Sequence, residues 1–415
     1  MHRPAELHWE TMAQQALAVT GGDALRKAPY PAWPTISGSD LERVREVLET
    51  SGWGGSSPPV ASFENLFAQY HDAAFGVAVS SGTMALELAM HAVGIGQGDE
   101  VIVPAHSFVA TATAVCRVGG VPVFVDIEAD TYNIDPVRVV EGLSSATKAM
   151  IPVHFGGVMA DMDRLGSVAT DSNTVVIEDA AHAHGAEWFG TRAGGLGTIG
   201  TFSFQNSKAM TAGEGGIFVT SDEDLAVKAR SIADAGRLPG KGWFEHFEIG
   251  TNLRMTAMQA VLLGSQLERL HDQIRLRAAN FGRFQRELEG VPGIDLQEAP
   301  PGATVQTRYI VPGRISESEF GTDRDHFVAA VQAEGVPVRP YYPHALYANP
   351  LFDRQPHRVL PCPVAEAATR NAFWLPMNIF MGTRDDAADA AKAIVKVHEA
   401  YRRSGSGKTN GSPAA

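Results

Sequence analysis

Short apolar runs alternate with amphipathic stretches through the first half of the chain. The apolar runs have the length of strands and lie at 75–80, 100–103, 121–126, 149–154, 174–178 and 216–220. Stretches with apolar residues three and four positions apart predict helices. They lie at 39–50, 83–93, 109–118, 136–143 and 162–169, with a further helix that ends at Ala233. Since strands separated by helices pair in parallel, the pattern predicts an α/β fold whose mostly parallel sheet is covered on both faces.

The pattern changes after this region. Residues 236–252 are rich in glycine and aromatic side chains and predict a long loop, which a long helix over 255–288 follows. A stretch with glycine and proline around Gly290 predicts a domain boundary, and the remainder alternates strand-like and helix-like segments. We therefore expect four parts. They are an N-terminal arm at 1–35, a large domain at 36–288, a small α+β domain at 289–403 and a disordered tail at 404–415.

Composition excludes several classes of protein. The chain has 415 residues and a formal net charge of −13, which argues against a nucleic-acid binder because phosphate binding needs clustered cations. No apolar run of about 18 residues predicts a membrane span, and the first residues are too polar for a signal peptide. The two cysteines, Cys116 and Cys362, are too few for a disulfide framework or a cysteine-based zinc site. We expect a cytoplasmic protein.

Two polar clusters follow predicted strands, at the sheet edge where ligands of such folds bind. Asp179, His182 and His184 follow the strand over 174–178, and Lys208 follows an apolar stretch and precedes four glycine-rich positions at 213–216. Singly, each residue has an ordinary interpretation. A loop lysine is usually solvated, an aspartate often caps a helix, and two histidines without a third ligand predict no metal site.

Together, these motifs closely resemble the DegT/DnrJ/StrS family of pyridoxal-phosphate-dependent aminotransferases, which act mostly on keto-sugars and cyclitols. The family's F-S-x-x-x-x-K motif and the T-x-G-E-G-G block occur at 202–208 and 211–216. Its E-D-x-A-x-A-x-G-A motif occurs at 178–186, and further matches occur at 81–83, 104–111 and 250–255. The resemblance runs from about residue 30 to 400. It implies a transferase of fold type I, with a mostly parallel seven-stranded sheet between helices and a small C-terminal α+β domain.

The resemblance also implies catalytic roles. Lys208 would form the internal aldimine with pyridoxal 5′-phosphate and later move the α-proton. Asp179 would pair with the pyridine nitrogen and keep it protonated, so that the ring accepts electrons. His182 would lie beside the phenolic oxygen of the cofactor, where many members of the family have glutamine.

Further residues are implied as cofactor contacts. Gly82 and Thr83, at a helix start, and the hydroxyl of Ser203 would hold the phosphate. Phe108 would stack on the ring. Asn252 would bind the phosphate in the neighbouring subunit, which implies a homodimer with shared active sites.

Substrate contacts are less specific. Arg254 is a candidate for carboxylate recognition. Tyr341, Tyr342 and His344 approximate a family Y-x-P-L-H pattern in which the histidine is displaced by one position. The expected partners are an amino-acid donor and a small keto substrate, with no nucleic acid, membrane or metal.

Three functions remain open. The leading hypothesis is transfer of an amino group from L-glutamate or L-glutamine to a cyclic ketone. His182 resembles the 3-amino-5-hydroxybenzoate synthase branch, which suggests dehydration and aromatisation, whereas residues 20–34 resemble glutamine-dependent cyclitol aminotransferases. A cofactor-binding regulatory subunit without turnover is the third. Dehydratases of the family replace the lysine with histidine, so Lys208 argues against that class. No G-x-G-x-x-G joins a strand to a helix, which argues against a nicotinamide enzyme.

Overall fold

The computed structural model of the chain describes residues 16–406, with side chains up to residue 403. Residues 1–15 of the expected arm and 407–415 of the expected tail lie outside the described residues. The described part of the arm, 16–35, runs along the last helix, where Arg26 forms ion pairs with Asp386 and Asp389. That helix continues to Ser406, so residues 404–406, which we expected in the tail, are helical.

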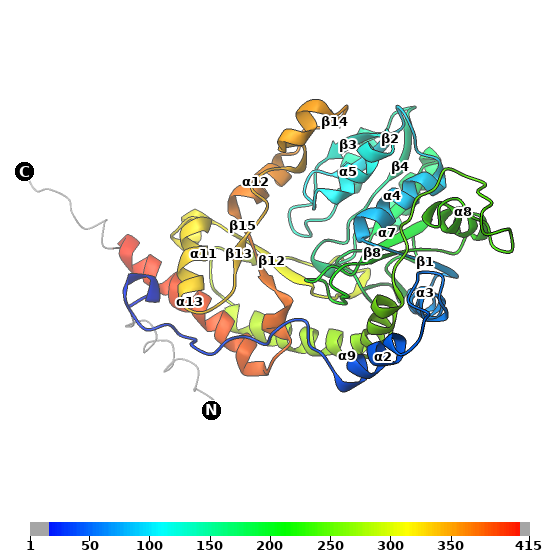
Figure 1. Cartoon of the computed structure of the whole chain (residues 1–415). Helices are drawn as coiled ribbons and strands as arrows, with labels where there is room; N and C mark the ends of the chain where they lie inside the picture. The colour runs from blue at the N-terminus through cyan, green and yellow to red at the C-terminus, as the bar shows by residue number, and fades with distance from the viewer. Residues whose placement is uncertain (1–15, 407–415) are drawn as a thin grey trace, which may run out of the picture.

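A mixed eight-stranded sheet lies at the centre of the larger part of the molecule (Figure 1). Its spatial order is β1 (Phe75–Val79), β9 (Gly216–Thr220), β8 (Ile199–Ser203), β5 (Val175–Asp179), β4 (Thr147–Met150), β2 (Glu100–Pro104), β3 (Val121–Val125) and β14 (Arg358–Val359). Strand β9 pairs antiparallel with both of its neighbours, and all the remaining pairs are parallel. The sheet is therefore mostly parallel, as predicted. Seven strands come from residues 75–220, and β14 adds a short eighth strand from the C-terminal region.

Helices cover both faces of this sheet. Side chains of neighbouring residues in a strand point to opposite faces, so each strand contributes to two hydrophobic cores. One core contains Val77, Val101 and Ile177, and the other contains Ala78, Ile102 and Val176. The first core includes α4 (Gly82–Val93), α5 (Ala110–Arg117), α8 (Glu223–Ala233) and α12 (Pro363–Asn371). The second includes α3 (Pro58–Tyr70), α6 (Pro136–Gly142), α7 (Met162–Ser172) and the first half of α9 (Ala257–Leu288). The α/β prediction is confirmed.

The sequence pattern did not predict helix α3. Its start, Ser57-Pro58-Pro59, has the composition of a loop. Proline is compatible with the first turn of a helix, however, because the amide that it lacks has no partner there. Helix α2 (Gly38–Leu48) begins one residue before the predicted start and ends two residues before the predicted end, and Ser37 and Asp40 form a capping box at its start.

A four-stranded antiparallel sheet forms the core of the C-terminal region (Figure 1). Its order is β10 (Ile294–Leu296), β12 (Ile310–Ile315), β15 (Ala372–Pro376) and β13 (Arg339–Pro340). It packs with α11 (Arg324–Ala333), α13 (Arg384–Ser406) and the end of α9. Because α9 leads from one core to the next, we propose that its end at Leu288 separates the two domains.

Smaller elements complete the described chain. Helix α10 spans Glu317–Phe320, and a three-stranded sheet has the order β11 (Ala303–Val305), β6 (Glu187–Trp188) and β7 (Thr191–Arg192). Short 3₁₀ turns lie at Ala18–Thr20, Phe155–Gly157, Leu346–Ala348, Pro350–Arg354 and Met377–Phe380. Residues 346–368 return to the large sheet, where β14 pairs with β3 and α12 joins the first core. Within residues 16–406, no helix is long and apolar enough to cross a membrane.

A buried ion pair joins the arm to the C-terminal region. Lys396 Nζ lies 2.8 Å from Glu334 Oε2, and both side chains are buried. Glu334 also accepts hydrogen bonds from the backbone N–H groups of Ala18 and Leu25. The pair therefore fixes α11, α13 and the arm relative to one another.

Replacing Lys396 by Met should lower the free energy of unfolding by about 3–5 kcal/mol, because the Glu334 carboxylate would stay buried without its counter-charge. Chemical denaturation followed by circular dichroism measures this loss. The double variant Lys396→Met with Glu334→Gln should be less destabilised than the single one. A double variant that is as unstable as the single one contradicts the coupling.

Candidate active site

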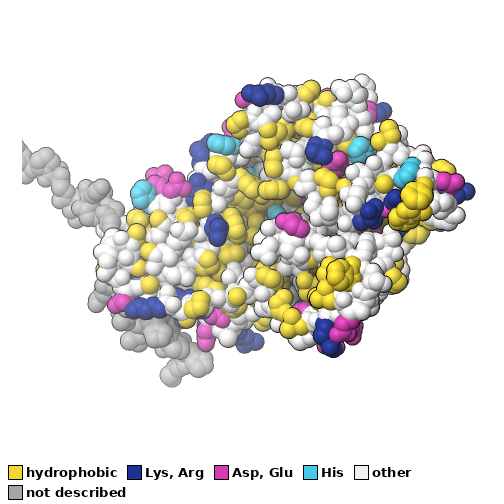
Figure 2. Space-filling model, in the orientation of Figure 1, with side chains coloured by type: hydrophobic (Ala, Val, Ile, Leu, Met, Phe, Trp, Pro, Cys, Tyr) yellow, Lys and Arg dark blue, Asp and Glu magenta, His cyan; other side chains and the backbone are white. Residues whose placement is uncertain are grey.

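Strand β5 ends in two carboxylates that face opposite sides of the sheet. Neighbouring residues of a strand alternate in direction, so Glu178 and Asp179 belong to different environments. Asp179 lines a cavity of about 460 Å³ at the carboxyl ends of the parallel strands. Near the middle of the face in Figure 2, hydrophobic side chains surround a hollow between the large and the small sheet.

The cavity brings together most of the residues that the motifs predicted. Its lining includes Gly82, Thr83, Phe108, Asp179, His182, Ser203, Lys208 and Tyr342. It also includes Ser107, Gln205, Ser207, Glu214 and Tyr309, to which the sequence gave no role. These residues come from the ends of five different strands (β1, β2, β5, β8 and β13) and from the segment before β12, so the fold assembles the site from distant parts of the chain.

Asp179 is buried, and two hydrogen bonds hold its carboxylate. Thr111 Oγ1 donates a hydrogen bond of 2.8 Å to Asp179 Oδ2, and the Ala181 N–H donates to Oδ1 at 3.3 Å. Burial raises the pKa of Asp179 above its ordinary value, while the Thr111 hydrogen bond and the charge of Lys208 oppose that rise. The only hydroxyl proton of Thr111 is used in its hydrogen bond to Asp179. Ser107 Oγ is therefore the donor in its hydrogen bond to Thr111 Oγ1, which is 2.9 Å long. This chain of hydroxyls fixes the orientation of the carboxylate.

His182 presents a hydrogen-bond donor to the cavity. The Gly156 N–H lies 3.3 Å from His182 Nδ1, which therefore accepts a hydrogen bond and carries no proton. Burial and the positive charge of Lys208 lower the pKa of His182 well below its ordinary value. The ring is therefore neutral, with its proton on Nε2, a form that can donate to an anionic oxygen.

Lys208 lies against an aromatic ring from the C-terminal region. Its Nζ is 4.6 Å from the centroid of Tyr309, whose ring also lies 4.5 Å from that of His182. The Tyr309 hydroxyl and Ser207 Oγ are 2.7 Å apart, and Trp33 Nε1 donates to the Lys208 carbonyl at 3.0 Å. Tyr309 is thus a contact that sequence reasoning missed. No motif surrounds it, and its distance from Lys208 in sequence hides the contact.

The start of α4 and the end of β8 approach each other closely. Gly82 begins the helix, and a Cβ atom at that position would lie 2.6 Å from the Cβ of Ser203. A Cβ at Gly216 would lie 2.4 Å from the backbone of Ser81. Glycine is required at both positions. Ser81 Oγ accepts a hydrogen bond from the Met84 N–H, whereas the Gly82 and Thr83 amides have no partner within the helix and can bind an anion beside the Ser203 hydroxyl.

These groups fit pyridoxal 5′-phosphate. The first turn of α4 suits its phosphate, the buried carboxylate of Asp179 suits its ring nitrogen, and the amine of Lys208 suits its aldehyde. The neutral donor of His182 suits its phenolic oxygen. The donor set therefore matches each polar group of the cofactor.

Four predicted residues lie outside this lining. Arg254 forms an ion pair of 2.5 Å with Asp234 in a different cavity, and Tyr341 packs among buried aromatic rings that include His106. His344 is exposed. Asn252 is also exposed, and its Oδ1 accepts a hydrogen bond from the Arg254 N–H. The roles implied for these four side chains stay predictions.

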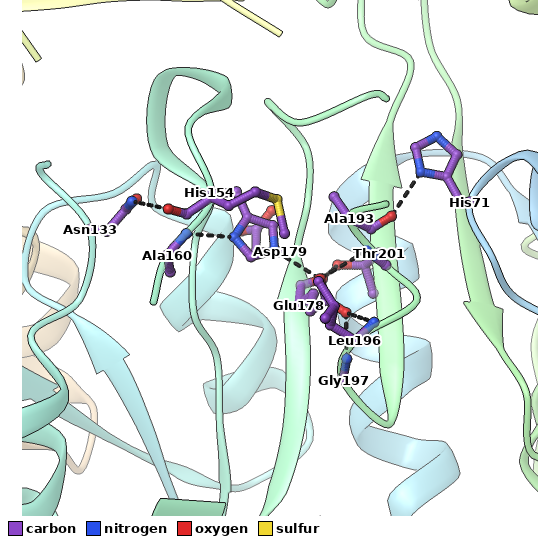
Figure 3. Close-up of polar contacts among 12 residues, drawn as sticks. His71, Asn133, His154, Ala160, Glu178, Asp179, Ala193, Leu196, Gly197 and Thr201 are labelled. Carbon is purple, nitrogen blue, oxygen red and sulfur yellow. Dashed lines mark hydrogen bonds and ion pairs between the residues drawn. The ribbon is translucent and has the colours of Figure 1, made fainter. Parts of the chain in front are cut away.

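Glu178 anchors the opposite side of β5 (Figure 3). Its fully buried carboxylate accepts four hydrogen bonds of 2.5–2.9 Å. The donors are His154 Nε2 and the N–H groups of Gly194, Leu196 and Gly197. His154 Nδ1 accepts a hydrogen bond from the Ala160 N–H, so the proton on Nε2 is the one that points at Glu178. His184 packs against Phe202 and Phe204 on this side, and no group of potential metal ligands forms among the described residues.

The hydroxyl of Thr111 gives a testable effect on the cofactor site. We expect affinity for pyridoxal phosphate to fall as pH falls through the pKa of Asp179, since a protonated carboxyl cannot hold a proton on the ring nitrogen. Thr111→Val removes an interaction that lowers this pKa, so the midpoint of the loss should move up by about one pH unit.

Fluorescence titrations of the cofactor at a series of pH values measure this midpoint. Thr113→Val is the matched control, because Thr113 lies on the same helix and its hydroxyl bonds to the Ala110 carbonyl. Equal midpoints for the two variants would show that Thr111 does not act on Asp179.

Comparison with known proteins agrees with this geometry. The model of the DegT/DnrJ/EryC1/StrS aminotransferase family matches residues 34–395. An L-glutamine:2-deoxy-scyllo-inosose aminotransferase from Streptomyces fradiae is 37% identical, over 92% of this chain and 97% of its own. The 3-amino-5-hydroxybenzoate synthase of Amycolatopsis mediterranei is 36% identical, over 89% of this chain and 97% of its own.

Solved structures show the same fold. The crystal structure of 3-amino-5-hydroxybenzoic acid synthase has a TM-score of 0.84 and 35% identity, and covers 89% of this chain and 99% of that protein. The structure of DesI with its TDP-sugar product has a TM-score of 0.83 and 30% identity, and covers 95% of this chain and 99% of that protein. The predicted fold type, enzyme class and cofactor are confirmed. The chain belongs to the DegT/DnrJ/EryC1/StrS aminotransferase family, whose enzymes use pyridoxal phosphate.

Proposed function

We propose that the enzyme transfers the amino group of L-glutamine to the keto group of a cyclitol of the scyllo-inosose type. The observation that carries this proposal is the similarity to L-glutamine:2-deoxy-scyllo-inosose aminotransferases. Relatives of this name from Streptomyces fradiae and Streptomyces kanamyceticus are 37% and 36% identical over 92% of the chain. The arm agrees with this assignment, because residues 20–34 resemble such enzymes.

The residues of the cavity have complementary roles in this reaction. Bound pyridoxal phosphate supplies a ring that accepts electrons from the carbon that loses its proton. Lys208 Nζ attaches the cofactor and moves a proton to and from that carbon, and the Asp179 carboxylate holds a proton on the ring nitrogen. His182 Nε2 donates to the phenolic oxygen. Tyr309 keeps the amine of Lys208 over one face of its ring between these steps.

We also propose a homodimer in which Asn252 completes the site of the partner. Asn252 is exposed and lies outside the cavity of its own chain. The preceding loop exposes a set of large apolar side chains, of which Phe244 is 87% and Ile249 100% exposed. Surfaces of this kind typically contact another protein.

The cysteines bear on the location of the protein. Cys116 and Cys362 are free, which suits a reducing compartment and agrees with the expected cytoplasmic location.

A second candidate reaction is aromatisation of a cyclic precursor with loss of water. The similarity to 3-amino-5-hydroxybenzoate synthase in sequence and structure favours it, as does His182. The two reactions have different products, because only the aminotransferase incorporates nitrogen from the donor.

Incubation with 2-deoxy-scyllo-inosose and L-glutamine labelled with ¹⁵N at its α-amino group should yield an amino-cyclitol that carries the ¹⁵N. Mass spectrometry detects this product. Lys208→Ala should reduce turnover by more than about 10³-fold and abolish the absorbance of the covalently attached cofactor. Lys148→Ala, at an exposed position of β4, is the control. No spectral change with glutamine or glutamate would overturn the proposal. An aromatic product without ¹⁵N would support the second reaction.

Mixing two inactive variants tests the shared site. Lys208→Ala and Asn252→Ala homodimers should each lose activity, whereas subunit exchange should restore about a quarter of it, because half of the dimers then contain one intact site. Light scattering measures the assembly. A monomeric holoenzyme, or a mixture without recovered activity, would show that Asn252 does not serve a partner.

A further inference from the structure

The cofactor cavity does not match the carboxylate of an amino-acid donor. Among the described residues that line it, Lys208 is the only cation, and Asp179 and Glu214 are acidic. Lys208 is needed to attach the cofactor and to move a proton. An α-carboxylate brought beside these two acidic groups therefore needs a cation from another part of the molecule.

A second cavity carries such a cation. It is open, has a volume of about 950 Å³ and meets the cofactor cavity at Tyr342, which lines both. Arg339 is the one charged residue among the described residues that line it. The rest of the lining is neutral, so no acidic side chain in this cavity competes for the guanidinium.

The guanidinium of Arg339 lies near an aromatic ring and has no carboxylate partner among the described residues. Arg339 on β13 lies opposite Trp374 on β15, and its Cζ is 5.9 Å from the centroid of the Trp374 ring. Within the described part of the chain, no carboxylate forms an ion pair with Arg339. By contrast, the other candidate, Arg254, already pairs with Asp234. Among these two, Arg339 is the cation that can accept a new anionic partner.

The unpaired guanidinium suits carboxylate recognition. Its planar N–H groups match the two oxygens of a carboxylate. At 5.9 Å from its Cζ, the Trp374 ring adds a weak cation–π attraction. In a chain with a net charge of −13, this local cation offsets the repulsion that an anionic donor meets.

We infer that Arg339, which lies near Trp374, binds the α-carboxylate of the amino-acid donor. Tyr342 lines both cavities, so this carboxylate subsite adjoins the cofactor cavity. The inference rests on the proposed aminotransferase function for the identity of its ligand, but the binding site itself can be tested without turnover.

The test compares two unreactive analogues of glutamine on the holoenzyme by calorimetry. 4-Carbamoylbutanoate keeps the carboxylate and lacks the amine, whereas pentanediamide has no carboxylate. Arg339→Ala should weaken binding of 4-carbamoylbutanoate by about 10- to 100-fold, and the effect on pentanediamide should be small. Arg339→Lys should be intermediate, since an ammonium group lacks the planar fork. The affinity for pyridoxal phosphate should not change.

Kinetics provide the second readout. Arg339→Ala should raise the KM for L-glutamine by a similar factor, with a smaller effect on kcat and on the KM for the ketone. Arg370→Ala, at an exposed position of α12, is the matched control and should behave as the wild type.

Two results would overturn the carboxylate subsite. One is a wild type that binds 4-carbamoylbutanoate no better than pentanediamide, and the other is an Arg339→Ala variant that loses both ligands equally. A loss seen with Arg254→Ala in place of Arg339→Ala would assign the carboxylate to Arg254. Failure of the proposed function gives a different result, because binding would still depend on Arg339 while glutamine would leave the bound cofactor unchanged.

Discussion

The buried carboxylate of Glu178 is the interaction on which the rest of the site depends. An ionised carboxylate in the interior is costly unless its oxygens are fully hydrogen bonded, and Glu178 meets that requirement with three backbone amides and His154. These donors belong to the segment after β4 and to the loop around Gly194–Gly197. The end of β5 is thereby fixed to its surroundings on one side of the sheet. Strand geometry then directs the next residue, Asp179, to the other side.

The parallel direction of the strands explains why the other contacts converge on Asp179. The carboxyl ends of β1, β2, β5 and β8 lie at the same edge of the sheet and lead to the residues that line the cofactor cavity. Helix α5 contributes Thr111, whose hydroxyl donates a hydrogen bond to the Asp179 carboxylate, and the first amides of α4 lie at the cavity. Burial favours the protonated form of Asp179, whereas the Thr111 hydrogen bond and Lys208 favour its ionised form. The charge on which the cofactor depends is therefore a balance set by the fold.

The sequence predicted those parts of the molecule that local pattern determines. Alternating strands and helices gave the α/β architecture, and the motifs around Asp179 and Lys208 located the cofactor site. Contacts between distant segments were missed. Tyr309 meets Lys208 only because β12 brings it there, and the role of Thr111 depends on the packing of α5 beside β5. Strand β14 has two residues, too few for a periodic pattern, and α3 begins with a sequence typical of a loop.

The separation of the cofactor cavity from Arg339 has a physical reason if one site serves an anionic donor and a neutral ketone in turn. An arginine inside the cofactor cavity would lose its partner whenever the ketone replaced the amino acid, and a buried unpaired charge is strongly unfavourable. Arg339 lies in an open cavity, where water can solvate its guanidinium during the half of the cycle without a carboxylate. An exposed cation beside the site can therefore bind one substrate without penalising the other.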